Sequence, residues 1–335
     1  MNVNTETAAP PAPPAFRWLV IAACLATYAL VVVGGIVRAT GAGDACPDWP
    51  RCHGELIPPL SGHVWIEFSH RLLASVIGLL VASTAFLAVR WQRRSPVVFW
   101  GSLLAAALVA GQIILGGVTV LSELHSGVVM AHLALASALL ATLIIVALAS
   151  LDVPPLAATD GRARPGALAF RNLALFAALS AFALMLTGSY VSGSGAGLAF
   201  RDWPLFDGKL MPDGGRLAMI HATHRFAAAA VGLVLAYLAY GAWRWQHDKL
   251  VLYGAFTALG LYVAQALVGA ANIWTLLQPS ARGAHLALAM ALWAVLVVVA
   301  TLATRATLDV RQERRVAEPT TREHAPAAIA ARGPS

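Results

Sequence analysis

The 335-residue chain is 59% hydrophobic and only 12% charged, whereas about 25% of the residues in an average soluble domain are charged. This composition excludes an ordinary water-soluble fold and indicates a protein whose partner is membrane lipid. The formal net charge of +7 does not indicate nucleic-acid binding, because the arginines are confined to particular loops and to the C-terminal tail.

Eight apolar runs follow one another along the chain. Each is long enough for a helix across a bilayer core of about 30 Å, which takes about 20 residues. The runs lie near residues 16–38, 67–90, 97–121, 127–150, 169–191, 219–243, 249–273 and 283–304. Strands of a membrane barrel would instead show runs of about ten residues with alternating polarity. We therefore predict an all-α membrane protein with eight transmembrane helices.

Basic residues predict the orientation of these spans. They gather at 90–96, 160–171 and 244–249 and in the tail after residue 304, which an alternating path places on one side of the membrane. The positive-inside rule makes this side cytoplasmic, so we expect a multi-pass plasma (inner) membrane protein with both termini in the cytoplasm. Residues 1–15 and 305–335 have the composition of disordered tails, and we expect no cleaved signal peptide.

The second half of the chain repeats the first. The segment GAGDACPDWPRCHGELIPP at 41–59 returns as GAGLAFRDWPLFDGKLMPD at 195–213, and MAHLALA returns later as GAHLALA. Four spans per repeat is an even number, so both halves enter the membrane in the same direction. We predict two tandem four-helix bundles at 16–150 and 169–304, related by a pseudo-twofold axis along the membrane normal and joined by a cytoplasmic linker at 151–168.

Four histidines occupy matched places near the outer ends of the even-numbered spans. Packing alone would explain matched glycines, but a polar side chain in lipid needs a partner. Zinc would take three or four donors together, whereas two histidines per bundle match the two axial positions of a heme iron. The histidines are His70, His132, His224 and His285, and the candidates for positioning the heme or pairing with its propionates are Arg38, Arg71 and Arg225.

Glu67 precedes His70 by three residues and shares its helix face, whereas the matching residue of the second half is His221. A carboxylate inside the membrane costs on the order of 2.5 to 3.5 kcal/mol at mid-depth and less near the interface. Two interpretations are open. Glu67 either pairs with Arg71 and anchors the helix end, or acts as an acid or base beside the group that His70 holds.

Taken together, these motifs resemble the heme A synthase family over about residues 16–304. The resemblance is carried by GGIVRATGAGDACPDWPRCHG, IEFSHR, LGGVTVL, MAHLALA, IHATHR and GAHLALA. It implies an enzyme that oxidises the C8 methyl group of heme O through hydroxylations to a formyl group, giving heme A for terminal oxidases. Heme O synthase and the terminal-oxidase assembly pathway are then the expected partners.

The resemblance also implies roles for individual residues. His224 and His285 would hold a low-spin heme b, His70 and His132 would surround the heme O site, and Glu67 matches the catalytic acid.

Cys46 and Cys52 lie in the first outer loop, on the oxidising side of the membrane, where a disulfide is chemically permitted. The pair is either a structural staple of the loop or, as the family resemblance implies, has a redox or heme-handling role. Phe200 and Phe206 stand at the matching places of the second loop. A function that needs two disulfides is therefore not expected.

Three other classes of protein fit parts of the pattern. A diheme b-type cytochrome that exchanges electrons with quinone would use the same four histidines, but it would not need Glu67 to differ from His221. A transporter with an internal repeat would place its site at the bilayer midplane, whereas the polar groups here cluster near the outer face. A disulfide-generating quinone enzyme would leave the histidines unexplained.

Overall fold

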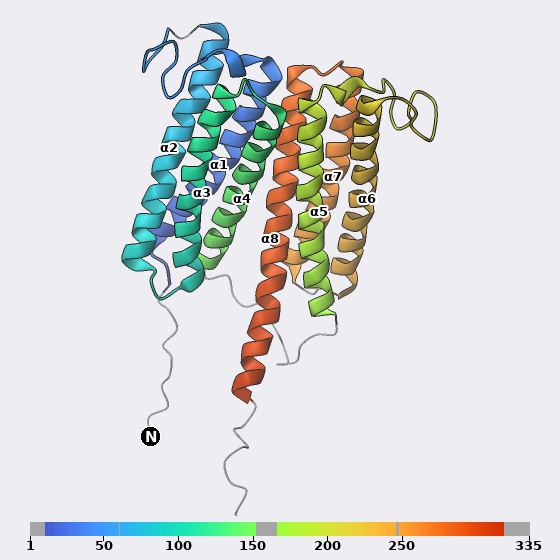
Figure 1. The fold of residues 1–335 in the computed structure, drawn as a ribbon. Helices are drawn as coiled ribbons and strands as arrows, with labels where there is room; N and C mark the ends of the chain where they lie inside the picture. Colours follow the sequence, from blue (N-terminus) through green and yellow to red (C-terminus); the bar gives the residue numbers. More distant parts are fainter. Residues whose placement is uncertain (1–10, 60, 152–165, 246–247, 318–335) are drawn as a thin grey trace, which may run out of the picture.

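The computed structural model describes residues 11–59, 61–151, 166–245 and 248–317. Its helices are α1 (Pro14–Thr40), α2 (Gly62–Trp91), α3 (Pro96–Leu121), α4 (Ser126–Ser150), α5 (Ala167–Gly193), α6 (Arg216–Trp245), α7 (Lys249–Trp274) and α8 (Pro279–Ala317), with short 3-10 turns η1 (Ala42–Asp44) and η2 (Ala196–Leu198) (Figure 1). Among the described residues, eight helices are long and apolar enough to cross a membrane. The described residues form no named strand, and the predicted all-α membrane fold is confirmed.

Signals in the sequence set several of the helix ends. Pro14 and Pro96 occupy the first turns of α1 and α3, where a missing backbone N–H costs nothing. Gly41 takes the left-handed conformation, with φ of 71°, and ends α1. The Asp248 side chain caps α7 by accepting hydrogen bonds from two backbone N–H groups of its first turn. These caps flank the apolar runs and so define the loops between them.

Helices α2 and α8 extend furthest beyond the apolar runs. Helix α2 begins at Gly62, ahead of the expected residue 67. Helix α8 continues to Ala317, so residues 305–317 are helical, whereas the sequence analysis assigned them to a disordered tail. The stretch RATLDVRQERRVA contains no proline or glycine and several strong helix formers. The rest of that tail (318–335), residues 1–10 and linker residues 152–165 lie outside the described residues.

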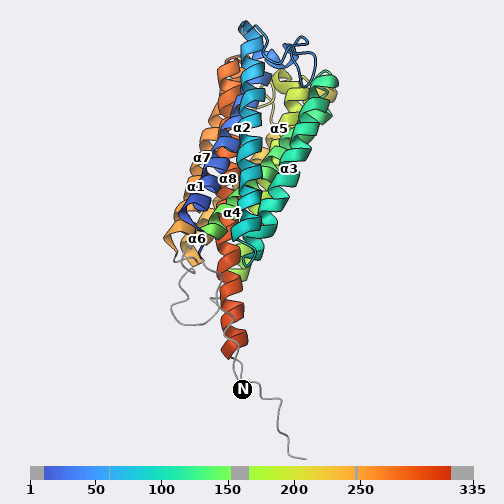
Figure 2. The same cartoon turned by 90° about the vertical axis from the view of Figure 1, so that its left-hand side faces the viewer.

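Each half of the chain packs its helices in a ring of four. Helix α1 contacts α2 and α4, and α3 closes the ring between them; α5 contacts α6 and α8, and α7 closes the second ring. The two groups stand side by side in Figure 1, and Figure 2 shows their helices running along a common direction. The pseudo-twofold axis between them stays a prediction.

The two rings share one continuous core along α1, α4, α5 and α8. The Tyr28 hydroxyl of α1 donates a hydrogen bond to the carbonyl oxygen of Ala287 in α8 (3.1 Å), and the Trp293 indole of α8 donates to that of Ser137 in α4 (3.0 Å). The largest buried cluster joins Leu140 of α4 to side chains of α5 to α8. The halves are therefore packed as a single body rather than linked by the chain alone.

Candidate functional site

The four matched histidines lie on α2, α4, α6 and α8, within about three helical turns of the ends that adjoin the outer loops. His70 and His132 are close enough to interact electrostatically, and so are His224 and His285. The structure thus brings together the two histidines of each half.

Each of these histidines packs against a glycine of a neighbouring helix. The four pairs are Gly34–His70, Gly116–His132, Gly188–His224 and Gly269–His285, and a Cβ atom on the glycine would lie 3.1, 3.3, 3.0 and 3.2 Å, respectively, from Cε1 of the imidazole. Such distances are shorter than ordinary van der Waals contact between carbon atoms. The glycines therefore provide the space that the rings occupy, and they do so at matched places in the repeat.

The surroundings of these histidines fit a heme. Nδ1 of His70, His132 and His285 is buried and has no hydrogen-bond partner among the described residues, which is uncommon for a buried polar atom. The same part of the chain contains no group of three or more His, Cys, Asp or Glu side chains that could hold a metal ion. Paired imidazoles between apolar helices suit two axial positions, not a closed three- or four-ligand metal site.

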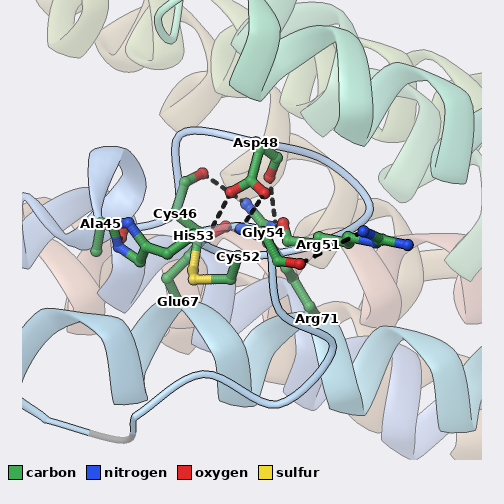
Figure 3. Close-up of a disulfide and its surroundings, with 9 residues drawn as sticks. All are labelled: Ala45, Cys46, Asp48, Arg51, Cys52, His53, Gly54, Glu67 and Arg71. Atoms are coloured by element: carbon green, nitrogen blue, oxygen red, sulfur yellow. Dashed lines mark hydrogen bonds and ion pairs between the residues drawn. A yellow bond between two sulfur atoms is a disulfide. The ribbon is translucent and has the colours of Figure 1, made fainter.

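The first outer loop is a compact unit closed by the disulfide between Cys46 and Cys52 (Figure 3). Cys52 and Glu55 exchange two backbone hydrogen bonds across a tight turn, in which His53 and Gly54 both have positive φ (55° and 78°). The Asp48 carboxylate accepts hydrogen bonds from the N–H groups of Gly54 (2.8 Å) and His53 (2.6 Å). These hydrogen bonds, and above all the one from Gly54, hold the pKa of the Asp48 carboxyl below its ordinary value.

Arg71 fastens this loop to α2. Its guanidinium donates to the carbonyl oxygens of Cys46 (2.9 Å), Asp48 (2.9 Å) and Arg51 (2.8 Å), and its Nε donates to Oε1 of Glu67 (2.8 Å). Four of the five N–H groups of the side chain are then engaged. Figure 3 shows Glu67 and Arg71 together on α2 beneath the disulfide. Arg71 is thus a clamp of the loop, and its pairing with a propionate stays a prediction.

Glu67 is only 5% exposed. The ion pair required by the anchor interpretation is present. Arg71 donates to Oε1, however, and none of the hydrogen bonds found among the described residues involves Oε2 of Glu67. The acid–base interpretation needs one oxygen that is held in place and one that is left for a substrate, and this carboxylate has both.

The second outer loop repeats this construction with different side chains. Asp202 accepts hydrogen bonds from the N–H groups of Asp207 and Gly208 (2.7 and 2.8 Å), and Arg225 donates to the carbonyl oxygens of Asp202 and Leu205 (2.9 and 2.6 Å). Both loops contain a cis peptide bond in their Trp–Pro step.

An aromatic pair replaces the disulfide in the second loop. Phe200 and Phe206 pack edge to face with ring centroids 4.9 Å apart, and the Arg225 guanidinium lies 5.5 and 5.3 Å from their centroids. Nε of Arg225 donates to Nε2 of His221 (3.2 Å). At the matching positions of the first half, Nε of Arg71 donates to the Glu67 carboxylate. The second loop therefore has no counterpart of either the disulfide or the buried carboxylate.

Arg38 lies half-buried in the last turn of α1. It is close enough to Arg282 of α8 to interact with it electrostatically, and Arg282 donates to the carbonyl oxygen of Ala39 (3.1 Å). Within the described residues, neither guanidinium has a carboxylate partner. Two neighbouring cations without an anion fit the proposed propionate role of Arg38.

The sequence analysis missed Arg282 and Thr187. The Thr187 hydroxyl lies 2.8 Å from Nδ1 of His224, which is the only one of the four matched histidines with such a contact in the described part of the chain. Arg282 falls opposite Val129 in the repeat, and Thr187 falls opposite Val33. These mismatches within the repeat were the signal that could have identified both residues.

Comparison with known proteins points to one family. A family model described as "Cytochrome oxidase assembly protein" (COX15-CtaA) matches residues 17–297. A heme A synthase from Rhizorhabdus wittichii is 30% identical over 347 aligned positions, covering 88% of this chain and 96% of the relative. One from Methylobacterium sp. is 31% identical over 352 positions, covering 87% and 92%. One from Geobacillus kaustophilus is 37% identical over 147 residues, so that match spans less than half of the relative, 46% of its length.

Proposed function

We propose that this chain, which belongs to the COX15-CtaA family of cytochrome oxidase assembly proteins, is a heme A synthase that oxidises the C8 methyl group of heme O to a formyl group. One observation carries the proposal. The two halves have the same pairs of glycine-seated histidines, but among the described residues only the first half has a buried carboxylate beside its pair, at Glu67. Two alike histidine pairs, of which one has a carboxylate beside it, fit a protein that holds one prosthetic heme and one substrate heme.

The second half is assigned to the prosthetic group. His224 and His285 would hold a heme b, which when bound would supply one-electron chemistry. Arg225 is engaged with the second loop, so its task is to hold that loop over the outer end of the bundle.

The first half is assigned to heme O. His70 and His132 flank the substrate, and the Arg38–Arg282 pair at the outer end of α1 and α8 is placed to receive a propionate. Arg71 fixes Oε1 of Glu67, and Oε2 then holds or delivers a proton at the substrate. A general acid in such a position contributes typically about 10² to 10⁴ in rate.

The loop with the disulfide supports this arrangement. Because Arg71 binds three loop carbonyls and Glu67 together, closure of the loop and orientation of the carboxylate are coupled. Basic residues at the opposite end of the spans support a location of the heme sites toward the non-cytoplasmic face of the plasma membrane. Heme O synthase, as the source of the substrate, and terminal oxidases, as recipients of the product, are the partners that this activity requires.

The test is to purify the protein, extract its non-covalent hemes and identify them by mass. We expect heme b together with heme O or its oxidised products. Heme b alone, in both halves, would favour the diheme cytochrome.

The ligand assignment is tested by spectroscopy. His224→Leu and His285→Leu should each remove a bis-histidine b-type spectrum, and His63→Leu, at an exposed residue at the start of α2, should not. If both heme-site variants kept the spectrum, the second-half assignment would be wrong.

A further inference from the structure

We propose that Thr187 is a positioning residue that fixes the tautomer of His224, and that its replacement by Val33 in the first half leaves that half with an exchangeable heme site. The inference rests on the proposed heme ligation by His224. It adds the reason why one site keeps its heme and the other releases it.

The hydrogen bonds of Thr187 determine the tautomer. Its Oγ1 lies 2.8 Å from the carbonyl oxygen of Leu184, to which it donates, and 2.8 Å from Nδ1 of His224. A hydroxyl has one proton, and a carbonyl oxygen can only accept. The hydroxyl proton is therefore committed to Leu184, and Oγ1 accepts from the N–H group at Nδ1. The neutral imidazole then has a free electron pair on Nε2, the atom that would bind iron.

The first half presents the same ring in the same pose without this hydrogen bond. A Cβ atom on Gly188 would lie 3.0, 3.6 and 3.7 Å from Cε1, Nε2 and Nδ1 of His224, and a Cβ atom on Gly34 would lie 3.1, 3.6 and 3.7 Å from the same atoms of His70. The residue before Gly34 is Val33, where the second half has Thr187. Nδ1 of His70 is buried and has no partner in the described part of the chain.

The hydrogen bond at Nδ1 should strengthen the binding of iron by His224 relative to His70. An acceptor on the distal ring nitrogen fixes the orientation of a ligand imidazole and makes it a stronger donor to the metal, and loss of such a partner typically costs about 10- to 100-fold in metal affinity or activity. A prosthetic heme has to stay through many turnovers, whereas a product heme has to leave after each one. The threonine stands in the half where retention is needed.

The experiment uses the purified full-length protein with its hemes. The variants are Thr187→Val, which keeps the shape, Thr187→Ser, which restores the hydroxyl, and the control Thr223→Val. Thr223 is an exposed neighbour of His224 whose hydroxyl donates to the carbonyl oxygen of Met219. Two quantities are measured: the rate at which heme b is transferred to excess apomyoglobin, and the midpoint potential of the bis-histidine heme.

We expect Thr187→Val to release heme b about 10- to 100-fold faster and to shift the midpoint potential upward, because a weaker ligand stabilises ferric iron less. Thr187→Ser should restore both quantities, and Thr223→Val should match the unmodified protein. The reciprocal Val33→Thr should slow the release of the heme at the first site.

The outcomes separate this inference from the one on which it rests. The role of Thr187 alone would be overturned if Thr187→Val showed a bis-histidine heme but had the same rate of heme b release and the same midpoint potential as the unmodified protein. Failure of serine to restore them would do the same. An unmodified protein without a bis-histidine heme would overturn the proposed ligation by His224, and the role of Thr187 with it.

Discussion

Nε of Arg71 lies 2.8 Å from Oε1 of Glu67, in an ion pair whose side chains are only 14% and 6% exposed. In the second half, the same helix positions hold a hydrogen bond from Arg225 to a neutral acceptor, His221. The loops above the two pairs are built alike. Besides the disulfide, the carboxylate is therefore the chemical difference between the two halves at this level, and under the proposed function it would set the substrate site apart from the heme b site.

The first prediction is that Glu67→Gln abolishes most heme A formation while heme b stays bound. Glutamine keeps the size of the side chain and can still accept a hydrogen bond from Arg71, but it cannot exchange a proton. Loss of a general acid should lower the rate by about 10²- to 10⁴-fold. Heme O, or a hydroxylated intermediate, should accumulate in membranes from cells that express the variant at the normal level.

The control for this variant is Glu55→Gln, the same change at an exposed carboxylate of the same loop. It should leave heme A at the normal level. Near-normal heme A in the Glu67 variant would remove its catalytic role and return Glu67 to the anchor interpretation.

The second prediction concerns the glycines that seat the histidines. In Gly188→Ala, the new Cβ would lie 3.0 Å from Cε1 of His224, so the imidazole has to move and the b-type spectrum should weaken or disappear. In Gly34→Ala, the displaced ring is His70, so heme A formation should fall while the b-type spectrum remains.

Matched controls exist on the same kind of helix. An alanine Cβ at Gly78 of α2 or Gly260 of α7 would meet no other atom within 4 Å. Alanine at those positions should therefore leave heme content and activity unchanged. If Gly188→Ala and Gly34→Ala gave the same phenotype, the division of labour between the halves would be wrong.

The helices and the repeat were predictable because lipid imposes a long apolar run on every span. Repetition of the segment at 41–59 as 195–213 indicated that the two loops would match, but only the structure shows that an aspartate closes the turn in each. The pairing of Arg71 with Glu67 was one of two open interpretations, but the contacts of Arg71 with the loop were not predictable. Those partners are backbone carbonyl oxygens, which every loop residue carries, so no residue type marks them in advance.

Thr187 was missed for a different reason. A threonine within a helix commonly bonds to a carbonyl oxygen of the preceding turn, as it does to Leu184, so the residue is fully explained without any role. The mismatch with Val33 marks the position in the sequence, but only the position of His224 in space shows that Oγ1 has a second partner. The early start of α2 at Gly62 was also missed, because its first turn is not apolar enough to mark a span.

The third prediction is that Cys46→Ala and Cys52→Ala lose the same amount of stability and of heme A formation, since either removes the bridge. For cysteines separated by 6 positions, the entropic estimate of the loss is about 2 kcal/mol. The measurement is thermal unfolding together with heme analysis. Cys24→Ala, in the middle of α1, is the control and should have no effect on the loop.

The second loop gives a contrasting case. Phe206→Ala should lower stability by removing the aromatic pair with Phe200, and this loss should be the same with and without reductant. Reductant should affect only the first loop. Full heme A formation in both cysteine variants would make the disulfide a dispensable staple.

The last prediction concerns the pH dependence of the first loop. The hydrogen bonds from Gly54 and His53 lower the pKa of Asp48 in the folded protein, so the carboxylate stabilises the closed loop. A lowered folded pKa gives stability that is fully present above the unfolded value, about 3.9, and that is lost as the pH falls through the lower folded value.

Asp48→Asn removes the charge at every pH. In the unmodified protein, reduction of the Cys46–Cys52 bridge by a phosphine should therefore be slow at neutral pH, and it should approach the faster rate of the variant only below about pH 4. Asp202→Asn changes the matching aspartate of the loop without a disulfide and should leave the reduction rate unchanged. Equal rates in Asp48→Asn and the unmodified protein at neutral pH would show that the aspartate does not hold the loop closed.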